Sequence, residues 1–378
     1  MRLRLLSVLV ALLAPPALPA QSGQFVVRLG VDTIAIEQYS RTPGRLEGEQ
    51  VLRSPHTMHR IYRASFAPGG ALERFELVTH NVSGAPGPAQ TTATAEIRGD
   101  SAIVTLPRGD STATQRVRLG AGGLIYAGTY AMLEEVTRRA RTAGGDRYTT
   151  SLLPLGAAEP WTVEVHRLGR DSLTMLLGPV GLLRLRVDDA GTLLGLSGAG
   201  STMQVTLERV QGLDFARVGT GFAPRSLGPL SPSDSVIATL AGGAALAVRY
   251  SRPAARGRVI FGGVVPWDRV WRTGANEATV FETSARLVVG GTVVPAGKYS
   301  LWTIPSPSGW KLILNRNVGQ WGTDYDARYD FARLDMQVEA LPQSVERFTI
   351  TIEPRGRDRA LLQLAWATTR AAVPVAAQ

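Results

Sequence analysis

The stretch SPHTMHRIYRASFAPGGALERFELVTH, residues 54–80, holds two runs of alternating apolar and polar residues on either side of Gly69 and Gly70. Alternation with a period of two is typical of β-strands that bury one face. Because glycine tolerates the backbone angles of tight turns, the two runs predict an antiparallel hairpin in which His59 lies opposite His80. This stretch therefore indicates an antiparallel β-protein.

The same alternation extends on both sides of the hairpin, from about residue 24 to residue 217. Turns that contain glycine separate the runs, as expected for an antiparallel sheet with one buried face. Besides the hairpin strands 61–66 and 75–78, the predicted strands of this half are 25–27, 33–36, 103–106, 163–165, 182–187 and 203–207.

One segment departs from this pattern. Residues 129–141 read TYAMLEEVTRRAR and are followed by Gly144 and Gly145. Apolar residues form one stripe, and two glutamates precede arginines by four positions, which suits helical ion pairing and the helix dipole. We predict a helix over about 129–143 that covers one face of the sheet. A sheet covered in this way is also a candidate holder of an apolar molecule.

Residues 219–235, GTGFAPRSLGPLSPSDS, are rich in Gly, Pro and Ser and predict a linker. Beyond it, short strand-like runs at regular spacing favour a β-sandwich over residues 236–375. The fold class is therefore all-β with two antiparallel domains: a curved sheet or open barrel with one covering helix (24–218), and the sandwich. The predicted strands of the second half are 236–240, 244–250, 278–284, 286–289, 299–304, 310–315, 347–352 and 361–366.

The first twenty residues, MRLRLLSVLVALLAPPALPA, have the layout of a secretory signal peptide. Arg2 and Arg4 precede an apolar run over 5–14, and a small-residue stretch ends at Ala20. We expect cleavage near Ala20 and a periplasmic or secreted protein. No other apolar stretch approaches membrane-spanning length, so we expect no transmembrane segment. Since the chain has no cysteine, it must be held together by burial without disulfides.

The formal net charge of +10 raises the question of nucleic-acid binding. Nearly all of the positive charge is arginine, since Lys298 and Lys311 are the only lysines, and the arginines are scattered among Ala and Gly. No basic run and no interleaved aromatic platform occurs, so we expect no nucleic-acid partner. Attraction to an anionic envelope surface fits this composition better.

Several long motifs of the second half resemble a bacterial family known as domain of unknown function 2911. The resemblance covers about residues 226–375 and implies an exported bacterial β-domain, with no activity attached to the family. No resemblance is found for the N-terminal half. The motifs are VRYSRPAARGRVIFGGVVPWDRVWRTGANEAT (248–279), VGGTVVPAGKYSLWTIP (289–305), LILNRNVGQWGTDYD (312–326), VERFTITIEP (345–354) and LLQLAWATTRAAVPV (361–375).

The densest polar cluster is WRTGANEAT, residues 271–279. Arg272 is a candidate clamp for a carboxylate, a phosphate or a sugar hydroxyl, with Asn276 and Glu277 supplying an amide and an acceptor. Trp267 and Trp321 lie in Pro/Gly loops and are candidate stacking platforms. The alternative is structural: a network in which Arg272 pairs with Glu277 and fixes the loop.

Three more arginines precede this cluster in the turn SRPAARGR. Arg252, Arg256 and Arg258 either form the rim of the same site or belong to a solvated charged loop. We take Arg252 as a candidate ligand residue alongside those of the cluster.

Hydrolytic chemistry usually needs a histidine, a cysteine or a carboxylate pair. All four histidines lie in the first half, so a Ser-His-Asp triad confined to the second domain is excluded. A glycan hydrolase that uses Glu277 with Asp324 or Asp268 stays open as an alternative, and the separation of the carboxyl groups would test it. A second alternative is a metal site formed by His56, His59 and His80, which the hairpin brings together.

These patterns predict an exported, non-catalytic binding or interaction module of the bacterial envelope, with no cofactor. The expected partner is a small molecule, a glycan or an envelope component that lies against the 271–279 cluster.

Overall fold

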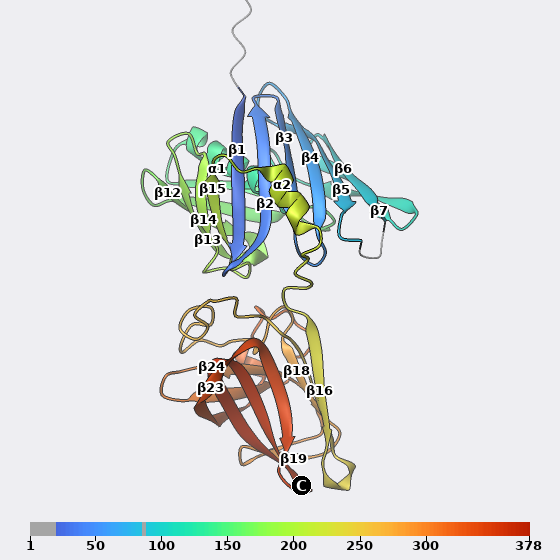
Figure 1. The fold of residues 1–378 in the computed structure, drawn as a ribbon, viewed down its shortest axis with the longest axis vertical. Coiled ribbons are helices and arrows are strands. Elements are labelled where there is room, and N and C mark those ends of the chain that lie inside the picture. The colour runs from blue at the N-terminus through green and yellow to red at the C-terminus, as the bar shows by residue number, and fades with distance from the viewer. Residues whose placement is uncertain (1–19, 85–87) are drawn as a thin grey trace, which may run out of the picture.

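The computed structural model describes residues 20–84 and 88–378 and contains two separate β-sheets. Figure 1 shows them as two bodies placed one after the other along the long axis of the molecule. The predicted all-β fold with two domains is therefore confirmed. The predicted signal peptide lies outside the described residues, apart from Ala20.

Two α-helices, α1 (Tyr130–Ala143) and α2 (Phe215–Phe222), accompany the sheets, and none of the helices in the described part of the chain has the length and apolarity needed to cross a membrane. Three short 3-10 helices occupy Gly178–Val180, Ala241–Gly243 and Ala327–Tyr329.

The N-terminal domain is a single sheet of 15 strands. All neighbouring pairs are antiparallel except β9 and β10. The strands are β1 (Gln21–Leu29), β2 (Asp32–Thr42), β3 (Arg45–Leu52), β4 (Met58–Phe66), β5 (Leu72–Asn81), β6 (Gln90–Arg98), β7 (Ser101–Arg108), β8 (Ser111–Arg118), β9 (Leu124–Tyr126), β10 (Arg147–Pro154), β11 (Trp161–Arg167), β12 (Ser172–Leu177), β13 (Leu182–Val187), β14 (Leu193–Ser197) and β15 (Thr206–Val210).

This sheet curls until its two edges meet. Its strand order begins at β8 and ends at β9, and the chain passes directly from one of these edge strands to the other through residues 119–123. The Gln115 side chain on β8 also donates to the Ala157 carbonyl beyond β10 at 3.0 Å. A short loop between the two edges requires strong curvature, so the predicted open barrel is confirmed.

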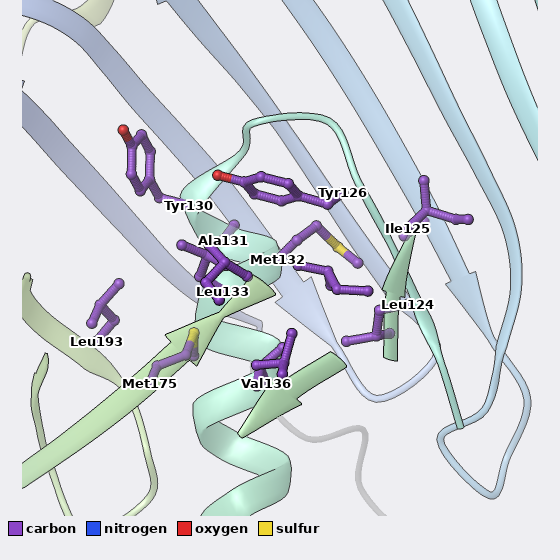
Figure 2. Close-up of a cluster of buried hydrophobic side chains, with 14 of the residues drawn as sticks. Leu124, Ile125, Tyr126, Tyr130, Ala131, Met132, Leu133, Val136, Met175 and Leu193 are labelled. Atoms are coloured by element: carbon purple, nitrogen blue, oxygen red, sulfur yellow. The ribbon is translucent and has the colours of Figure 1, made fainter. Parts of the chain in front are cut away.

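Helix α1 lies inside this barrel. Figure 2 shows the N-terminal half of the helix among buried side chains of the strands. Met132, Leu133 and Val136 are fully buried among strand residues, so the interior is filled by side chains of α1. The predicted bounds of the helix are confirmed, and so are its ion pairs from Glu134 to Arg138 and from Glu135 to Arg139.

The prediction that α1 covers a single face of the sheet is wrong, because the sheet wraps around it. Glu134 is only 1% exposed. Its carboxylate accepts from the Tyr39 hydroxyl at 2.5 Å and from an Arg209 guanidinium nitrogen at 2.7 Å. Barrel strands thus supply the polar partners that a buried carboxylate requires.

The start of α1 is held by a carboxylate from the sheet. Its N-cap residue, Thr129, makes no side-chain capping bond. Instead, Glu37 of β2 accepts from the backbone N–H groups of Tyr130 and Ala131, at 2.9 Å and 2.8 Å. A negative charge at this position interacts favourably with the helix dipole and satisfies N–H groups that have no partner within the helix. Glu37 therefore fixes where α1 enters the barrel.

Helix α2 packs on the outside of the barrel, where Figure 1 shows it across β2 and β3. Phe215 lies against Val26, Ile36 and Val51, which face outward from β1, β2 and β3. The sequence predicted a linker over residues 219–235. The linker is shorter than predicted, because α2 and β16 extend into this range from its two ends. In the structure, the connection between the domains is residues 223–232.

The C-terminal domain is one sheet of nine strands that folds over itself into the predicted sandwich. The 25-residue strand β23 pairs with β22 along its first part and with β24 along the rest. Both layers bury one shared core. The strands are β16 (Ser233–Thr239), β17 (Ala245–Ser251), β18 (Thr279–Thr283), β19 (Leu287–Val289), β20 (Thr292–Val294), β21 (Gly297–Ile304), β22 (Trp310–Asn315), β23 (Asp330–Pro354) and β24 (Arg359–Ala377).

Aromatic side chains fill one end of this core. Trp271 stacks on Trp366 with ring centroids 5.8 Å apart and meets Phe348 edge-on at 5.1 Å. Trp310 and Trp302 are both buried, but Trp302 packs on the other face of the sheet against Tyr325. The aromatic cluster around Trp271 forms the floor of the region where the two domains meet.

Candidate functional site

The two domains touch where the turn between β1 and β2 meets residues 252–258. The Val31 N–H donates to the Arg256 carbonyl at 3.0 Å, and the Arg256 guanidinium forms an ion pair with Asp32. Gly30 is required here, because it has a φ of 60° and a Cβ atom would overlap the Arg256 carbonyl. This contact sets the position of one domain on the other.

A cleft of about 400 Å³ opens beside this contact. We call it the interdomain cleft, because residues of both domains line it. The N-terminal domain contributes Leu29, Ile34, Tyr130 and 202–205, and the C-terminal domain contributes the aromatic floor and the 271–276 segment. The volume lies within the range of small-molecule binding sites.

Arg272, the central residue of the predicted site, lies in this cleft. Its side chain is half-buried and runs close over Gly322, where a Cβ atom would be 3.0 Å from the Nη1 atom. The only hydrogen bond of the guanidinium among the described residues is a long one, 3.4 Å from Nη1 to the Asn276 carbonyl. Burial lowers the pKa of Arg272. The predicted structural pair does not form, since no ion pair in the described chain joins Arg272 to Glu277.

The backbone around the cleft is strained. Thr273 has a φ of 53° and Asn276 a φ of 60°, and the cleft-lining residues Arg256 and Gln204 have φ values of 52° and 54°. Positive φ is rare for residues other than glycine, and it is especially unfavourable for a β-branched residue such as Thr273. Thr273 is held by its Oγ1 atom, which is 3.1 Å from Oγ1 of Thr303. Such conformations concentrate at active sites and ligand clamps.

The predicted aromatic platforms fall in different places. Trp321 is 43% exposed and lines the cleft, as does the half-buried Trp271. Trp267 is 36% exposed and lies against Phe261, with ring centroids 6.0 Å apart, but it does not line the cleft. Of these tryptophans, Trp321 and Trp271 line the cleft and Trp267 does not.

Arg252 lies outside the cleft and is fully engaged in the C-terminal domain. It forms an ion pair with Asp234 at 3.1 Å and donates to Oγ1 of Thr349 at 2.9 Å. The other two arginines of the SRPAARGR turn do line the cleft, in agreement with the rim interpretation. Arg256 is only 7% exposed, which rules out a solvated loop at that residue.

Glu277 is exposed and faces a different surface from Arg272. It lines a second groove, of about 550 Å³, together with Asp234, Arg249 and Tyr250. Asp268 and Asp324, the partners considered for a hydrolase, are both exposed and line neither this groove nor the interdomain cleft.

The histidines of the first hairpin pair as the sequence predicts. His59 is opposite His80 in the ladder, and their ring centroids are 6.1 Å apart. The Nε2 atom of His59 is 2.7 Å from a carboxylate oxygen of Glu49. Within residues 20–84 and 88–378, no three His, Asp or Glu side chains form a group suited to a metal ion, and His56 belongs to no such group.

Sequence reasoning missed the contribution of the N-terminal domain to the site. Met203, Gln204 and Tyr130 line the cleft from segments that contain no polar motif, and the Gln204 side chain reaches the Val264 carbonyl at 3.4 Å. Their role arises only when the two domains dock.

Comparison with known proteins places the second half of the chain. Residues 231–375 match the family model described as "Protein of unknown function (DUF2911)", which confirms the resemblance seen in the sequence. A search of the curated proteins found no match.

Among solved structures, a DUF1089 family protein from Pseudomonas aeruginosa is similar, with 15% identity over 44% of this chain and 90% of that chain and a TM-score of 0.33. A β-barrel-like protein of the domain of unknown function DUF1849 from Brucella abortus is also similar, with 10% identity over 52% of this chain and 96% of that chain and a TM-score of 0.33.

Proposed function

We propose that this protein is an exported, non-catalytic binding module of the bacterial envelope, and that its ligand, a small molecule, a glycan fragment or an envelope component, lies in the interdomain cleft. The observation that carries the proposal is the joint construction of one cleft by both domains around Arg272 and Trp321. Clefts between domains are common ligand sites. The strained residues Asn276, Arg256 and Gln204 at its wall support the same assignment.

The chemistry of the cleft favours binding over catalysis. None of the described residues that line it is Asp, Glu or His. A general acid or base near neutral pH is usually one of these three residue types. Burial raises the pKa of Tyr130, the tyrosine that lines the cleft, well above its ordinary value, so this hydroxyl stays protonated. The lining therefore offers donors and apolar surface for holding a ligand.

A ligand-observed NMR screen of a mixed fragment library against the purified protein tests this assignment. We expect hits that bind the wild type and are lost in Ala275→Trp, because Ala275 lines the cleft and an indole there would fill it. Ala327→Trp is the matched control, since Ala327 is exposed in the same domain and lies outside the cleft. A screen without hits, or hits that persist in Ala275→Trp, would contradict the proposal.

The proposed export of the protein can be tested separately. When the full gene product is expressed in a bacterium, the protein is expected in the periplasm or the medium, with an N-terminus near Gln21. Edman sequencing or intact mass of the fractionated protein checks this. Replacing Arg2 and Arg4 by glutamate removes the positive n-region and should leave uncleaved protein in the cytoplasm. Retention of residues 1–20 in the exported wild type would show that this segment is not a cleaved signal.

A further inference from the structure

The residues that line the interdomain cleft carry positive charge without negative charge. Arg256, Arg258 and Arg272 belong to the lining, and no Asp or Glu of the described residues does. A concave site with charges of one sign and low-dielectric walls focuses the field and attracts ligands of the opposite sign. The charge distribution therefore points to an anion.

Arg256 supplies a buried donor without an acceptor. The residue is 7% exposed, and one terminal nitrogen pairs with Asp32. Its Nε atom is buried and has no hydrogen-bond partner among the described residues. Buried polar groups in native proteins are nearly always hydrogen-bonded, so such an atom calls for an explanation. Because Arg256 lines the cleft, its charge adds to the potential there, although Nε itself is enclosed by the protein.

Arg258, the third arginine of the same turn, is less available as a donor to a ligand. It donates to the carbonyl groups of Ala255 and Ala254 at 3.0 Å and 2.7 Å. Burial lowers its pKa, and Arg256 adds to this effect while Glu346 opposes it. Its bonds close the turn, and its charge adds to the potential in the cleft.

Arg272 is the available cation. It has no ion pair in the described chain, and its single hydrogen bond, at 3.4 Å, is too long to engage the guanidinium strongly. Burial is the only cause that lowers its pKa, and no acidic neighbour opposes it. A planar guanidinium presents two parallel N–H groups that match carboxylate and phosphate oxygens.

The rest of the cleft is apolar. Leu29, Ile34 and Met203 line it from one domain, and Val265, Trp271 and Trp366 from the other. An inorganic anion would leave this surface in contact with water, whereas an apolar group attached to the anion would bury it. Burial of apolar surface contributes roughly 25 cal/mol per Å². The lining thus fits a molecule with one charged end and an apolar body.

We propose that the interdomain cleft binds a small organic anion whose carboxylate or phosphate oxygens accept hydrogen bonds from Arg272, and whose apolar body lies against Trp271 and Met203. This inference rests on the proposed function, since it names the ligand class of the same site. Carboxylate and phosphate share the oxygen acceptors that the Arg272 guanidinium recognises.

Isothermal titration of the purified protein with three probes of one tail length tests the ligand class: octanoate, octyl phosphate and 1-octanol. We expect one or both anions to bind about tenfold or more tightly than the alcohol, because charge-assisted hydrogen bonds are stronger than neutral ones. The better of the two anions identifies the preferred head group. Higher salt should reduce this preference.

Variants test whether Arg272 causes the preference for anions over 1-octanol. Arg272→Gln should lower the affinity for the bound anions by about tenfold and leave that for 1-octanol unchanged. Arg272→Lys, which keeps the charge without the planar fork, should fall between. Arg269→Gln is the matched control, because Arg269 is exposed in the same segment and does not line the cleft. Circular dichroism confirms that each variant is folded.

The outcomes separate the two proposals. If 1-octanol binds the wild type as tightly as the anions, the anion assignment is overturned while the cleft remains a ligand site. If none of the three probes binds, the assignment to an organic anion with an apolar body is overturned, and the fragment screen with Ala275→Trp decides on the cleft separately. If Arg269→Gln loses as much affinity as Arg272→Gln, the preference reflects general surface charge and the site assignment fails.

Discussion

Replacing Glu37 by alanine is expected to lower the free energy of unfolding by about 3–5 kcal/mol, because breaking a buried charged network strands its partners. The carboxylate is fully buried and accepts four hydrogen bonds. The Tyr62 hydroxyl donates at 2.9 Å and the Gln50 amide at 2.7 Å, and the other two donors are the first N–H groups of α1. Alanine leaves all four without an acceptor inside the barrel and removes the anchor of the helix.

Urea unfolding at pH 8, where the Glu37 carboxyl group is ionised, measures this loss by circular dichroism. Glu208→Ala is the control, because Glu208 lies on the outer face with 61% of its side chain exposed, where its ion pair with Arg28 contributes little. We expect the control to stay within about 0.5 kcal/mol of the wild type. A Glu37→Ala variant that is as stable as this control would show that Glu37 does not hold α1.

The same carboxyl group gives the protein a pH dependence of known sign. Burial raises the pKa of Glu37 from 4.5 to about 7, against the hydrogen bonds that favour its ionised form. Between these values the folded protein keeps the proton while the unfolded chain has lost it, so the free energy of unfolding falls as the pH rises. With about 1.4 kcal/mol per pKa unit, this contribution is about 3 kcal/mol and is complete above pH 7.

Glu37→Gln isolates this contribution, because its amide does not titrate. The difference in unfolding free energy between wild type and variant should shift by about 3 kcal/mol between pH 4.5 and pH 7 in urea titrations. Carboxyl groups with lowered pKa values, such as Asp100 and Asp189, act at lower pH and are present in both proteins. Parallel pH profiles of the two proteins would contradict the assignment.

Asp32→Ala is expected to loosen the docking of the two domains by about 2–3 kcal/mol. The Arg256 side chain is 6% exposed, and its charge would remain in the interface without a counter-ion. The effect is smaller than for a fully buried pair, since the Asp32 side chain is 32% exposed. Each domain keeps its own core, so secondary structure should be retained.

Limited proteolysis of the 223–232 connection reports on this loosening, because opening exposes the segment to the protease. A change of 2 kcal/mol corresponds to about a 30-fold larger open population and a matching rise in cleavage rate. Asp110→Ala is the control, since Asp110 is exposed on the β7–β8 turn, far in sequence from the docking contact. Equal cleavage of Asp32→Ala and Asp110→Ala would refute the role of the Asp32–Arg256 pair.

The strands, the main helix and the hairpin register could be predicted because each depends on a pattern of residues that are close together in the sequence. The His59–His80 pairing follows from two alternating runs and one glycine turn, and the bounds of α1 follow from its apolar stripe and the glycines after it. The surroundings of α1 could not be predicted. Glu134 and Glu135 have the pattern of a solvent-facing surface, yet both are buried because strands far away in sequence supply their arginine and tyrosine partners.

The candidate site divides in the same way. Arg272, Asn276 and Trp321 could be chosen from sequence because polar residues concentrate on one loop, and all three do line the cleft. Arg252, Glu277 and Trp267 carry the same local signal but point to other surfaces. No local pattern separates the two groups, since the direction of a loop side chain depends on what packs against it.

By itself the sequence determined a two-domain β-protein with one long helix and a polar loop in a family-like second half, because periodicity and turn residues act over a few positions. Only the tertiary structure decided that this loop faces the other domain, that Arg256 is buried, and that the charged residues among the described cleft lining are all arginines. Asp32 and Arg256 are 224 positions apart, and burial of such a charge depends on a partner that arrives through folding.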